Sequence, residues 1–163
     1  ENLLGEEGQG LGYLMTNVEQ GRVSIAVSAA CPRERMHEDT LTYAQERTAF
    51  GGPIARLQGI QFALAEVAAK LDAARLLTMH AARLRDAGEP HTAAGAKAKL
   101  FASQVAVDAA DTCVQTLGGY GYSAEFPAER LYRDARITQI YEGTSEIQRL
   151  VIARDLLGEA ARG

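Results

Sequence analysis

The segment Tyr141–Gln148, with the sequence Y-E-G-T-S-E-I-Q, combines residue types that a proton-transfer site requires. Glu142 supplies a carboxylate, and Gly143 allows another molecule to approach the backbone closely. Thr144 stands at the predicted start of a helix, where unpaired amide groups suit an anion or a carbonyl oxygen. The neighbouring apolar pair Ile140-Tyr141 could raise the pKa of this carboxyl toward neutrality by desolvation, as a general base requires. A solvated loop glutamate next to a helix cap explains the same spacing and is the commoner case, so the sequence leaves both interpretations open.

A second candidate is the glycine-rich segment Gln115–Tyr122, Q-T-L-G-G-Y-G-Y. Gly118, Gly119 and Gly121 let the backbone turn sharply and approach another molecule. A helix end needs only one glycine, yet helix termination remains the commoner explanation for such a segment. The segment lacks the preceding strand of a dinucleotide-binding fingerprint and the Lys-Ser/Thr pair of a P-loop.

A third candidate is the turn at Glu46–Ile54, where Arg47 ends a predicted helix and Phe50-Gly51-Gly52-Pro53 follows. A cation at a helix C-terminus favours the helix dipole and needs no ligand. The same guanidinium could equally pair with a phosphate group supplied by a partner.

The histidines and cysteines indicate no further chemistry. His37, His80 and His91 lack metal-ligand spacing and are predicted to lie at the surface or at an interface, so no metal site is expected. Cys31 and Cys113 cannot form a disulfide framework and are predicted to be buried, inert thiols.

Long amphipathic helices must position these segments. Apolar and small residues alternate by threes and fours from position 57 to position 81, before a stop at residues 87–90. This spacing predicts one buried seam, made of Leu57, Ile60, Leu64, Val67, Leu71, Ala74, Thr78 and Ala81. A second helix starts near residues 90–92 and ends at Gly118-Gly119, with a predicted seam of Leu100, Ser103, Val107, Ala110, Val114 and Leu117. The short connection between them predicts an antiparallel pair.

Two further helices complete the predicted domain. One runs from Arg22 to about Arg47, with a kink and interruption expected at Pro32. The other begins near residues 144–145, where Ser145 and Gln148 resemble a capping box, and ends before Gly158. Its predicted inward residues are Ile147, Leu150, Val151 and Leu157. A short helical turn is expected after residue 127. The predicted fold is all-α, an up-and-down four-helix-bundle-like domain with an extra short helix and a glycine-rich loop.

Composition excludes several classes of function. The formal net charge is -4, which gives no overall attraction to a nucleic acid. No run approaches the roughly 20 apolar residues of a membrane span, and residues 1–20 lack the order of a signal peptide. A reduced, cytoplasmic protein without membrane attachment is expected. The chain begins at Glu1 within a polar, glycine-rich phrase, so an upstream portion is expected to be missing.

Taken together and in this order, these segments resemble the C-terminal domain of the acyl-CoA dehydrogenases, flavoenzymes that oxidise acyl-CoA thioesters between the α and β carbons. The resemblance covers essentially the whole chain as one domain, residues 1–163. The matching segments are Asn2–Gly10, Gly21-Arg22, the Arg47–Pro53 turn, Gln58, Gln115–Tyr122, Arg133–Gln148 and the closing helix.

The resemblance implies a role for each segment. Glu142 would be the catalytic base that removes the substrate's α-proton while hydride leaves the β-carbon for flavin N5, and Arg22 and Gly143 would bind the acyl-CoA substrate. The thioester would be polarised by the flavin ribityl chain and by the backbone amide of Glu142. The positions that match FAD contacts are Arg47, Gln58, Gln115, Thr116, Leu117, Gly118, Gly119, Thr144 and Glu146.

The resemblance also implies partners. A flavoprotein-type electron acceptor is expected, as is a homodimer or homotetramer in which Arg47, Gln58 and the glycine-rich loop serve the flavin of a neighbouring subunit. The chain alone is expected to be inactive, because the family's N-terminal helical and middle β domains are absent from it. A flavin-dependent oxidase or monooxygenase relative and a non-catalytic partner subunit are the alternative interpretations.

Position 21 sharpens the assignment of the base. Isovaleryl-type and long-chain relatives carry their catalytic glutamate just before the arginine that matches Arg22, where this sequence has Gly21. Glu142 is therefore the candidate base at the family's two known locations. Two departures from the family pattern are Ala49, where many members have a polar residue, and Pro32.

Overall fold

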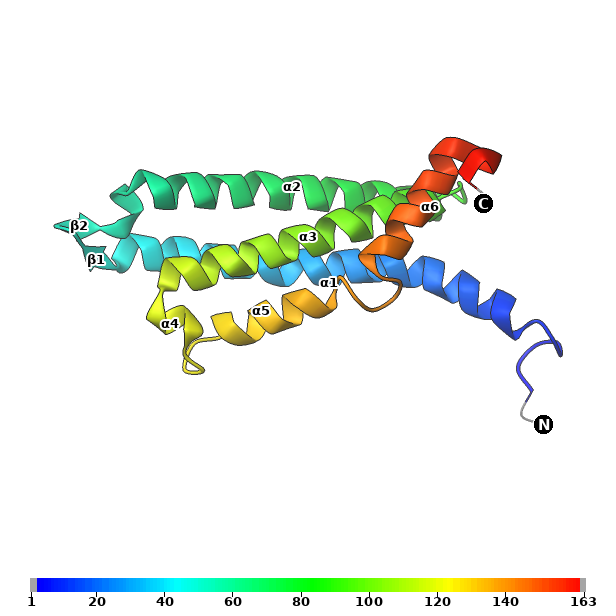
Figure 1. Ribbon diagram of the computed structural model, residues 1–163, viewed down its shortest axis with the longest axis horizontal. Coiled ribbons are helices and arrows are strands. Elements are labelled where there is room, and N and C mark those ends of the chain that lie inside the picture. Colours follow the sequence, from blue (N-terminus) through cyan, green and yellow to red (C-terminus); the bar gives the residue numbers. More distant parts are fainter. Residues whose placement is uncertain (1–2, 162–163) are drawn as a thin grey trace.

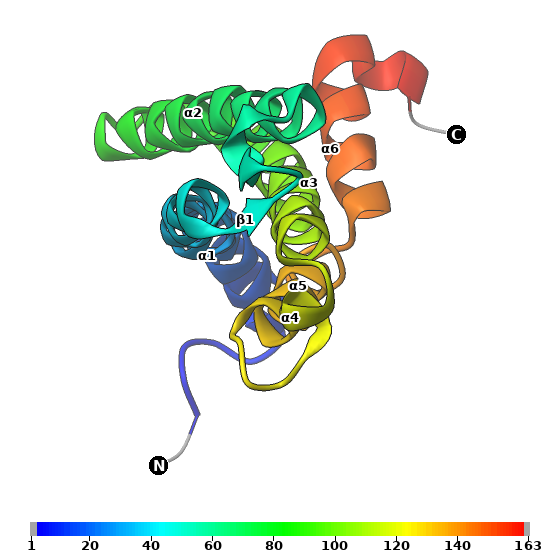
Figure 2. The same cartoon turned by 90° about the vertical axis from the view of Figure 1, so that its left-hand side faces the viewer.

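A computed structural model describes residues 3–161 and contains three long helices that lie side by side (Figures 1 and 2). These are α1 (Gly10–Glu46), α2 (Gln58–Asp86) and α3 (Thr92–Leu117). The shorter helices are α4 (Gly119–Tyr122), α5 (Ala128–Ile137) and α6 (Ser145–Leu157), with 3-10 turns at Ile54–Arg56 and Gly158–Ala161. Both α5 and α6 pack against α3, which is therefore the central helix. The predicted all-α bundle is confirmed.

A short hairpin joins α1 to α2 at one end of the bundle (Figure 1). Strand β1 (Thr48–Ala49) pairs antiparallel with β2 (Gly52–Pro53). Its turn residues Phe50 and Gly51 have φ angles of 52° and 84°, the left-handed values that two-residue hairpin turns require.

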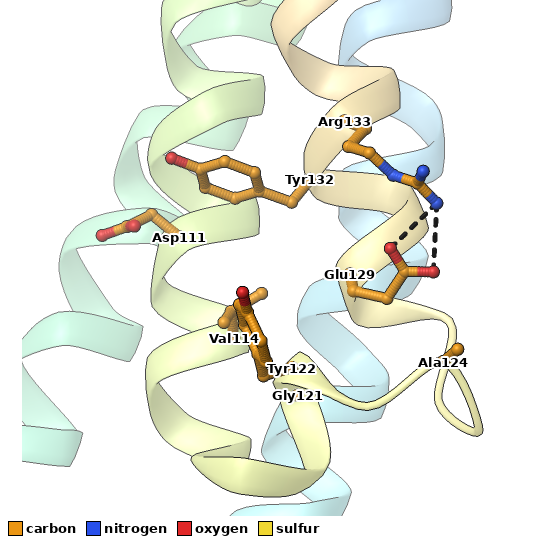
Figure 3. A pocket seen from close by; sticks show the side chains of 8 residues that line it. All are labelled: Asp111, Val114, Gly121, Tyr122, Ala124, Glu129, Tyr132 and Arg133. Carbon is orange, nitrogen blue, oxygen red and sulfur yellow. Dashed lines mark hydrogen bonds and ion pairs between the residues drawn. The ribbon is translucent and has the colours of Figure 1, made fainter.

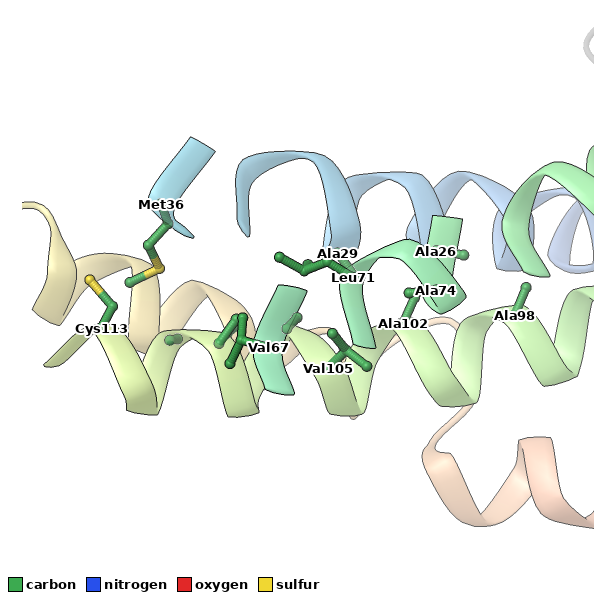
Figure 4. Packing of buried hydrophobic residues seen from close by; sticks show 14 of the residues in the cluster. Ala26, Ala29, Met36, Val67, Leu71, Ala74, Ala98, Ala102, Val105 and Cys113 are labelled. Atoms are coloured by element: carbon green, nitrogen blue, oxygen red, sulfur yellow. The ribbon is translucent and has the colours of Figure 1, made fainter. Parts of the chain in front are cut away.

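Small side chains form most of the core along α3 (Figure 4). The α2 seam is as predicted from position 64 onward, because Leu64, Val67, Leu71, Ala74, Thr78 and Ala81 are buried. The α3 seam is partly wrong: Ser103 and Ala110 are buried as predicted, but Leu100, Val107, Val114 and Leu117 are only half-buried. Neighbours surround α3 on several sides, and the small buried side chains of Ala102 and Ala106 allow the helices to approach one another closely.

The outer helices correct three further predictions. Helix α1 begins at Gly10, twelve positions before the predicted Arg22, and continues without a break through Pro32. On α6, Ile147, Leu150 and Leu157 are exposed instead of facing the bundle, and the one buried residue described there is Gln148. A helix with exposed apolar side chains has an apolar face left uncovered by this chain.

No helix among the described residues is long and apolar enough to cross a membrane. The same residues contain no group of three or more His, Cys, Asp or Glu side chains placed to hold a metal ion. Both cysteines are free thiols; Cys113 is buried as predicted, but Cys31 is exposed on α1.

Candidate active site at the Glu142 turn

Two consecutive residues with left-handed backbone conformation, Glu142 and Gly143, lie in the segment that connects α5 to α6. We call this pair the Glu142 turn. The φ angles are 52° for Glu142 and 86° for Gly143. The left-handed conformation costs a non-glycine residue about 1–2 kcal/mol. The surroundings of the turn must therefore hold Glu142 in place, and such strained residues cluster at functional sites.

Two buried side chains donate hydrogen bonds to the carbonyl oxygens of the Glu142 turn. The Lys99 Nζ of α3 donates a hydrogen bond of 2.8 Å to the carbonyl oxygen of Gly143. The Gln148 Nε2 of α6 donates to the same oxygen at 2.9 Å and to the Glu142 carbonyl oxygen at 3.4 Å. Both Lys99 and Gln148 have 0% of their surface exposed. The backbone amide of Ser145 adds a 3.0 Å bond to the carbonyl oxygen of Gln139.

Sequence reasoning missed Lys99 and gave Gln148 a different role. The available signal was spacing, because Lys99 lies one turn from both Gly95 and Ala102 on the small-residue face of α3, where a lysine is unexpected. The capping box was wrong: the N-cap of α6 is Thr144, whose Oγ1 accepts from the Ile147 amide at 3.4 Å.

The carboxylate of Glu142 faces α1 at Gly21. A Cβ atom built on Gly21 would lie 3.0 Å from Glu142 Oε2, closer than most Cβ contacts. The next residue, Arg22, is only 3% exposed, and its Nε and Nη1 atoms have no hydrogen-bond partner in the described part of the chain. A Cβ on Gly95 of α3 would lie 3.9 Å from Arg22 Cβ. The fold therefore gathers the predicted base and substrate-binding residues in one region between α1, α3 and α6.

Burial, hydrogen bonds and neighbouring charged groups shift the pKa values of Lys99 and Glu146 in this region. Burial lowers the pKa of Lys99, and the charge of Arg22 lowers it further, while Glu146 and Glu142 oppose that change. Glu146 lies in the first turn of α6, and hydrogen bonds from its own backbone amide and from the Thr144 hydroxyl lower its pKa. Lys99 is therefore buried beneath the Glu142 turn, whereas the Glu142 and Glu146 residues are exposed.

A second group of predicted cofactor residues lies at the hairpin end of the bundle. Arg47 and residues 116–119 help to line a cavity of about 530 Å³. The φ of Gly118 is 60° with ψ at -132°, and no atom lies within 4 Å of a Cβ built on Gly118 or Gly119, so the loop leaves open space there. The Arg47 guanidinium lies over the Tyr120 ring, 5.8 Å from its centroid.

The remaining predicted cofactor residues do not line this cavity. Thr144 and Glu146 line a smaller cavity of about 180 Å³, together with Arg136 and Arg149. Gln58 and Gln115 are exposed on α2 and α3. From Lys99 to Leu117 the helix α3 advances by about 27 Å at 1.5 Å per residue, so the two groups of cofactor residues lie far apart in one chain.

The largest cavity described, of about 740 Å³, contains none of the residues predicted to bind substrate or FAD, although Gly121 and Tyr122 of the glycine-rich segment line it (Figure 3). It lies where α3, α4 and α5 meet, beside the ion pair that Arg133 Nη2 forms with Glu129 Oε2 at 2.9 Å. Gly121 lines it, and a Cβ there would lie 2.6 Å from the Val114 carbonyl oxygen. This third glycine of the segment therefore serves close packing of α4 on α3.

A sequence model of the acyl-CoA dehydrogenase C-terminal domain matches residues 8–157. The chain belongs to the acyl-CoA dehydrogenase family. Its relatives include the mitochondrial short-chain specific acyl-CoA dehydrogenase of Mus musculus, which is 52% identical over 157 residues. Those residues are 96% of this chain and 38% of that protein.

Solved structures of acyl-CoA dehydrogenase relatives share the fold. Butyryl-CoA dehydrogenase from Megasphaera elsdenii has a TM-score of 0.93 and 43% identity, covering 96% of this chain and 41% of that one. A structure described as the electron transferring flavoprotein of Acidaminococcus fermentans has a TM-score of 0.94 and 44% identity, with the same coverage of 96% and 41%. This chain therefore spans between 38% and 41% of the length of these acyl-CoA dehydrogenase relatives.

Proposed function

We propose that this sequence forms the C-terminal helical domain of a longer, FAD-dependent acyl-CoA dehydrogenase that converts an acyl-CoA thioester to the enoyl-CoA. The observation that carries the proposal is the Glu142 turn, which holds a carboxylate against Gly21 beside the buried Arg22. The family membership of the chain supports the reaction class. Under this proposal the chain alone is inactive, since it spans less than half of its relatives.

Glu142 would act as the base. Its carboxylate takes the α-proton of the substrate, and the electron pair of that C–H bond forms the new double bond to the β-carbon. Gly143, which has no side chain, would let the thioester approach the backbone, and the Glu142 amide would donate to the thioester oxygen. Arg22 would donate hydrogen bonds to the substrate from its buried Nε and Nη1 atoms, which have no partner among residues 3–161.

The residues at the hairpin end fit part of an FAD molecule. The open space over Gly118 and Gly119 suits close approach of a ligand to the backbone, and the Arg47 guanidinium suits a phosphate. FAD, when bound, would accept the hydride that leaves the substrate's β-carbon. Thr144 and Glu146 lie near the base and would contact the reactive part of the cofactor.

The separation of these two groups supports an oligomer. The Glu142 turn is hydrogen-bonded to Lys99, and the glycine-rich loop follows Leu117, about 27 Å further along α3. One chain cannot bring both to the same part of a flavin, so Arg47, Gln58 and Gln115–Gly119 would serve the flavin of a neighbouring subunit. A homodimer or homotetramer follows. A flavoprotein-type electron acceptor would reoxidise the cofactor, and the likeness to the Acidaminococcus fermentans structure supports that partner.

The test is Glu142→Gln in the full-length polypeptide, mixed anaerobically with a panel of acyl-CoAs while the flavin absorbance is followed. Loss of the base should lower the rate of flavin reduction by about 10²–10⁴-fold with flavin still bound. Glu38→Gln is the control, because Glu38 lies exposed on α1 and has Arg35 as an ion-pair partner at 3.9 Å. Unchanged reduction in Glu142→Gln contradicts the assignment, and a flavin that no acyl-CoA reduces in the wild type contradicts the reaction.

A further inference from the structure

The carbonyl oxygen of Gly143 accepts hydrogen bonds from two side chains that solvent does not reach, Lys99 at 2.8 Å and Gln148 at 2.9 Å. Polar side chains buried this completely are rare unless their hydrogen bonds compensate for lost hydration. We propose that Lys99 and Gln148 are positioning residues that orient Glu142 by fixing the peptide groups on both sides of Gly143. The proposal rests on the function proposed above for Glu142.

The position of Lys99 argues against a role in packing alone. Its neighbours on the same helix face include Ala96, Ala102 and Ser103, and all of them are fully buried. An ammonium group among such residues loses hydration, as the lowered pKa of Lys99 reflects. The hydrogen bond described for Lys99 Nζ reaches a residue 44 positions away in sequence, at the Glu142 turn. The lysine therefore links the central helix of the bundle directly to that turn.

Gln148 occupies the space that a side chain at position 143 would need. A Cβ on Gly143 would lie 2.8 Å from Gln148 Nε2, and the φ of 86° also favours glycine. The Oε1 atom of the same amide is buried without a partner in the described part of the chain. An apolar residue at position 148 would not bury an unpaired acceptor. The advantage of glutamine at this position is therefore the pair of hydrogen bonds that its Nε2 donates.

The geometry explains how these contacts reach the carboxylate. Peptide groups are planar, so each anchored carbonyl oxygen fixes the plane of its peptide. Gln148 bonds the Glu142 carbonyl, and both side chains bond the Gly143 carbonyl, which together fix the two planes that meet at the Gly143 Cα. The plane between Glu142 and Gly143 in turn restricts the backbone of Glu142, and thus the direction of its side chain toward Gly21.

The test uses Lys99→Met and Gln148→Met in the full-length protein. Each replaces a polar group by an unbranched apolar one of similar length. We expect the rate constant for flavin reduction at saturating acyl-CoA to fall about tenfold or more, because small misplacements of a reacting group are costly. Bound flavin and melting temperature should stay near wild type. Lys97→Met is the matched control, since Lys97 lies two positions away on α3 with its ammonium near the surface, 3.8 Å from Asp155.

A double-mutant cycle separates positioning from a general structural role. If Lys99 and Gln148 act through Glu142, adding either substitution to Glu142→Gln should leave the residual rate unchanged. Equal losses in both backgrounds overturn the proposal, as does failure of both variants to fold. Wild-type rates of flavin reduction in Lys99→Met and Gln148→Met would overturn the positioning role but would leave the assignment of Glu142 as the base unaffected. A wild-type rate in Glu142→Gln would instead refute the proposed function.

Discussion

At the residue scale, Gly21 and Glu142 share one small volume although 121 positions separate them in sequence. The missing side chain at position 21 leaves room for the carboxylate. Gly21→Ala would place a Cβ 3.0 Å from Glu142 Oε2 and displace that carboxylate. Glycine inside a helix costs about 0.8–1.0 kcal/mol relative to alanine, so the same substitution should stabilise α1. We expect flavin reduction to slow about tenfold while the melting temperature rises.

Gly12→Ala is the control for this prediction. Gly12 also lies in α1, and the nearest atom to a Cβ there is Gln9 Oε1 at 3.9 Å. The Gly12→Ala substitution should therefore stabilise α1 without slowing flavin reduction. Equal rates in both variants would show that the carboxylate does not depend on the space over Gly21.

Lys99 gives a prediction of pH dependence. Burial lowers its pKa in the folded protein below the value of about 10.4 for an exposed lysine. Between the lowered pKa and about pH 10.4, the unfolded chain therefore binds more protons than the folded one, and stability rises with pH. Melting temperatures of wild type and Lys99→Met, measured from pH 7 upward, should show the wild type gaining relative to the variant. A constant difference would mean that the ammonium group is not desolvated.

At the element scale, the small-residue face of α3 determines how closely its neighbours approach. Ala102 has 0% exposure within this face. Ala102→Leu should lower the free energy of unfolding by about 1–3 kcal/mol, because added methyl groups force neighbouring helices apart. Ala69→Leu on the exposed side of α2 should change stability little. Chemical denaturation of both variants compares the two positions, and equal effects would contradict tight packing on α3.

Helix periodicity predicted elements better than it predicted burial. The regular seam of α2 was predicted correctly from Leu64 onward because one face of that helix meets the bundle, whereas Leu57 is exposed and Ile60 is only half-buried. On α3 the same rule favoured Leu100 and Val107, yet a helix with several neighbours buries its alanines most deeply. The prediction that Leu150 of α6 faces the bundle was wrong for a related reason. Periodicity identifies the apolar face of a helix but not what covers that face.

The features of the candidate site also fall into those that the local sequence predicts and those that depend on tertiary packing. Glu142, Gly143 and Thr144 are adjacent in sequence, and their local signals of glycine and helix cap made the turn predictable. The bond from Lys99 to Gly143 spans 44 positions and depends on the tertiary packing of α3 against the segment before α6, which no local pattern encodes. The proximity of Gly21 to Glu142 depends on packing as well, although the family resemblance pointed to the same pair of positions.

At the scale of the whole molecule, the distance between Arg47 and Glu142 predicts complementation between subunits. Arg47→Ala and Glu142→Gln should each be weakly active as homo-oligomers. Mixed oligomers, formed by unfolding and refolding the variants together, should regain activity, because one site in each mixed pair combines the intact Arg47 of one subunit with the intact Glu142 of the other. No recovery in verified mixed oligomers would mean that both residues serve the same subunit's flavin.

The fit between Gly21 and Glu142 also constrains how the base could move during evolution. A glutamate at position 21 would meet the carboxylate of Glu142 in the same space, and two such groups cannot both stay ionised at short range. Losing Glu142 first removes the base altogether. Either order of single changes passes through an impaired protein, so relocation of the base is an epistatic step in which the two positions must change together.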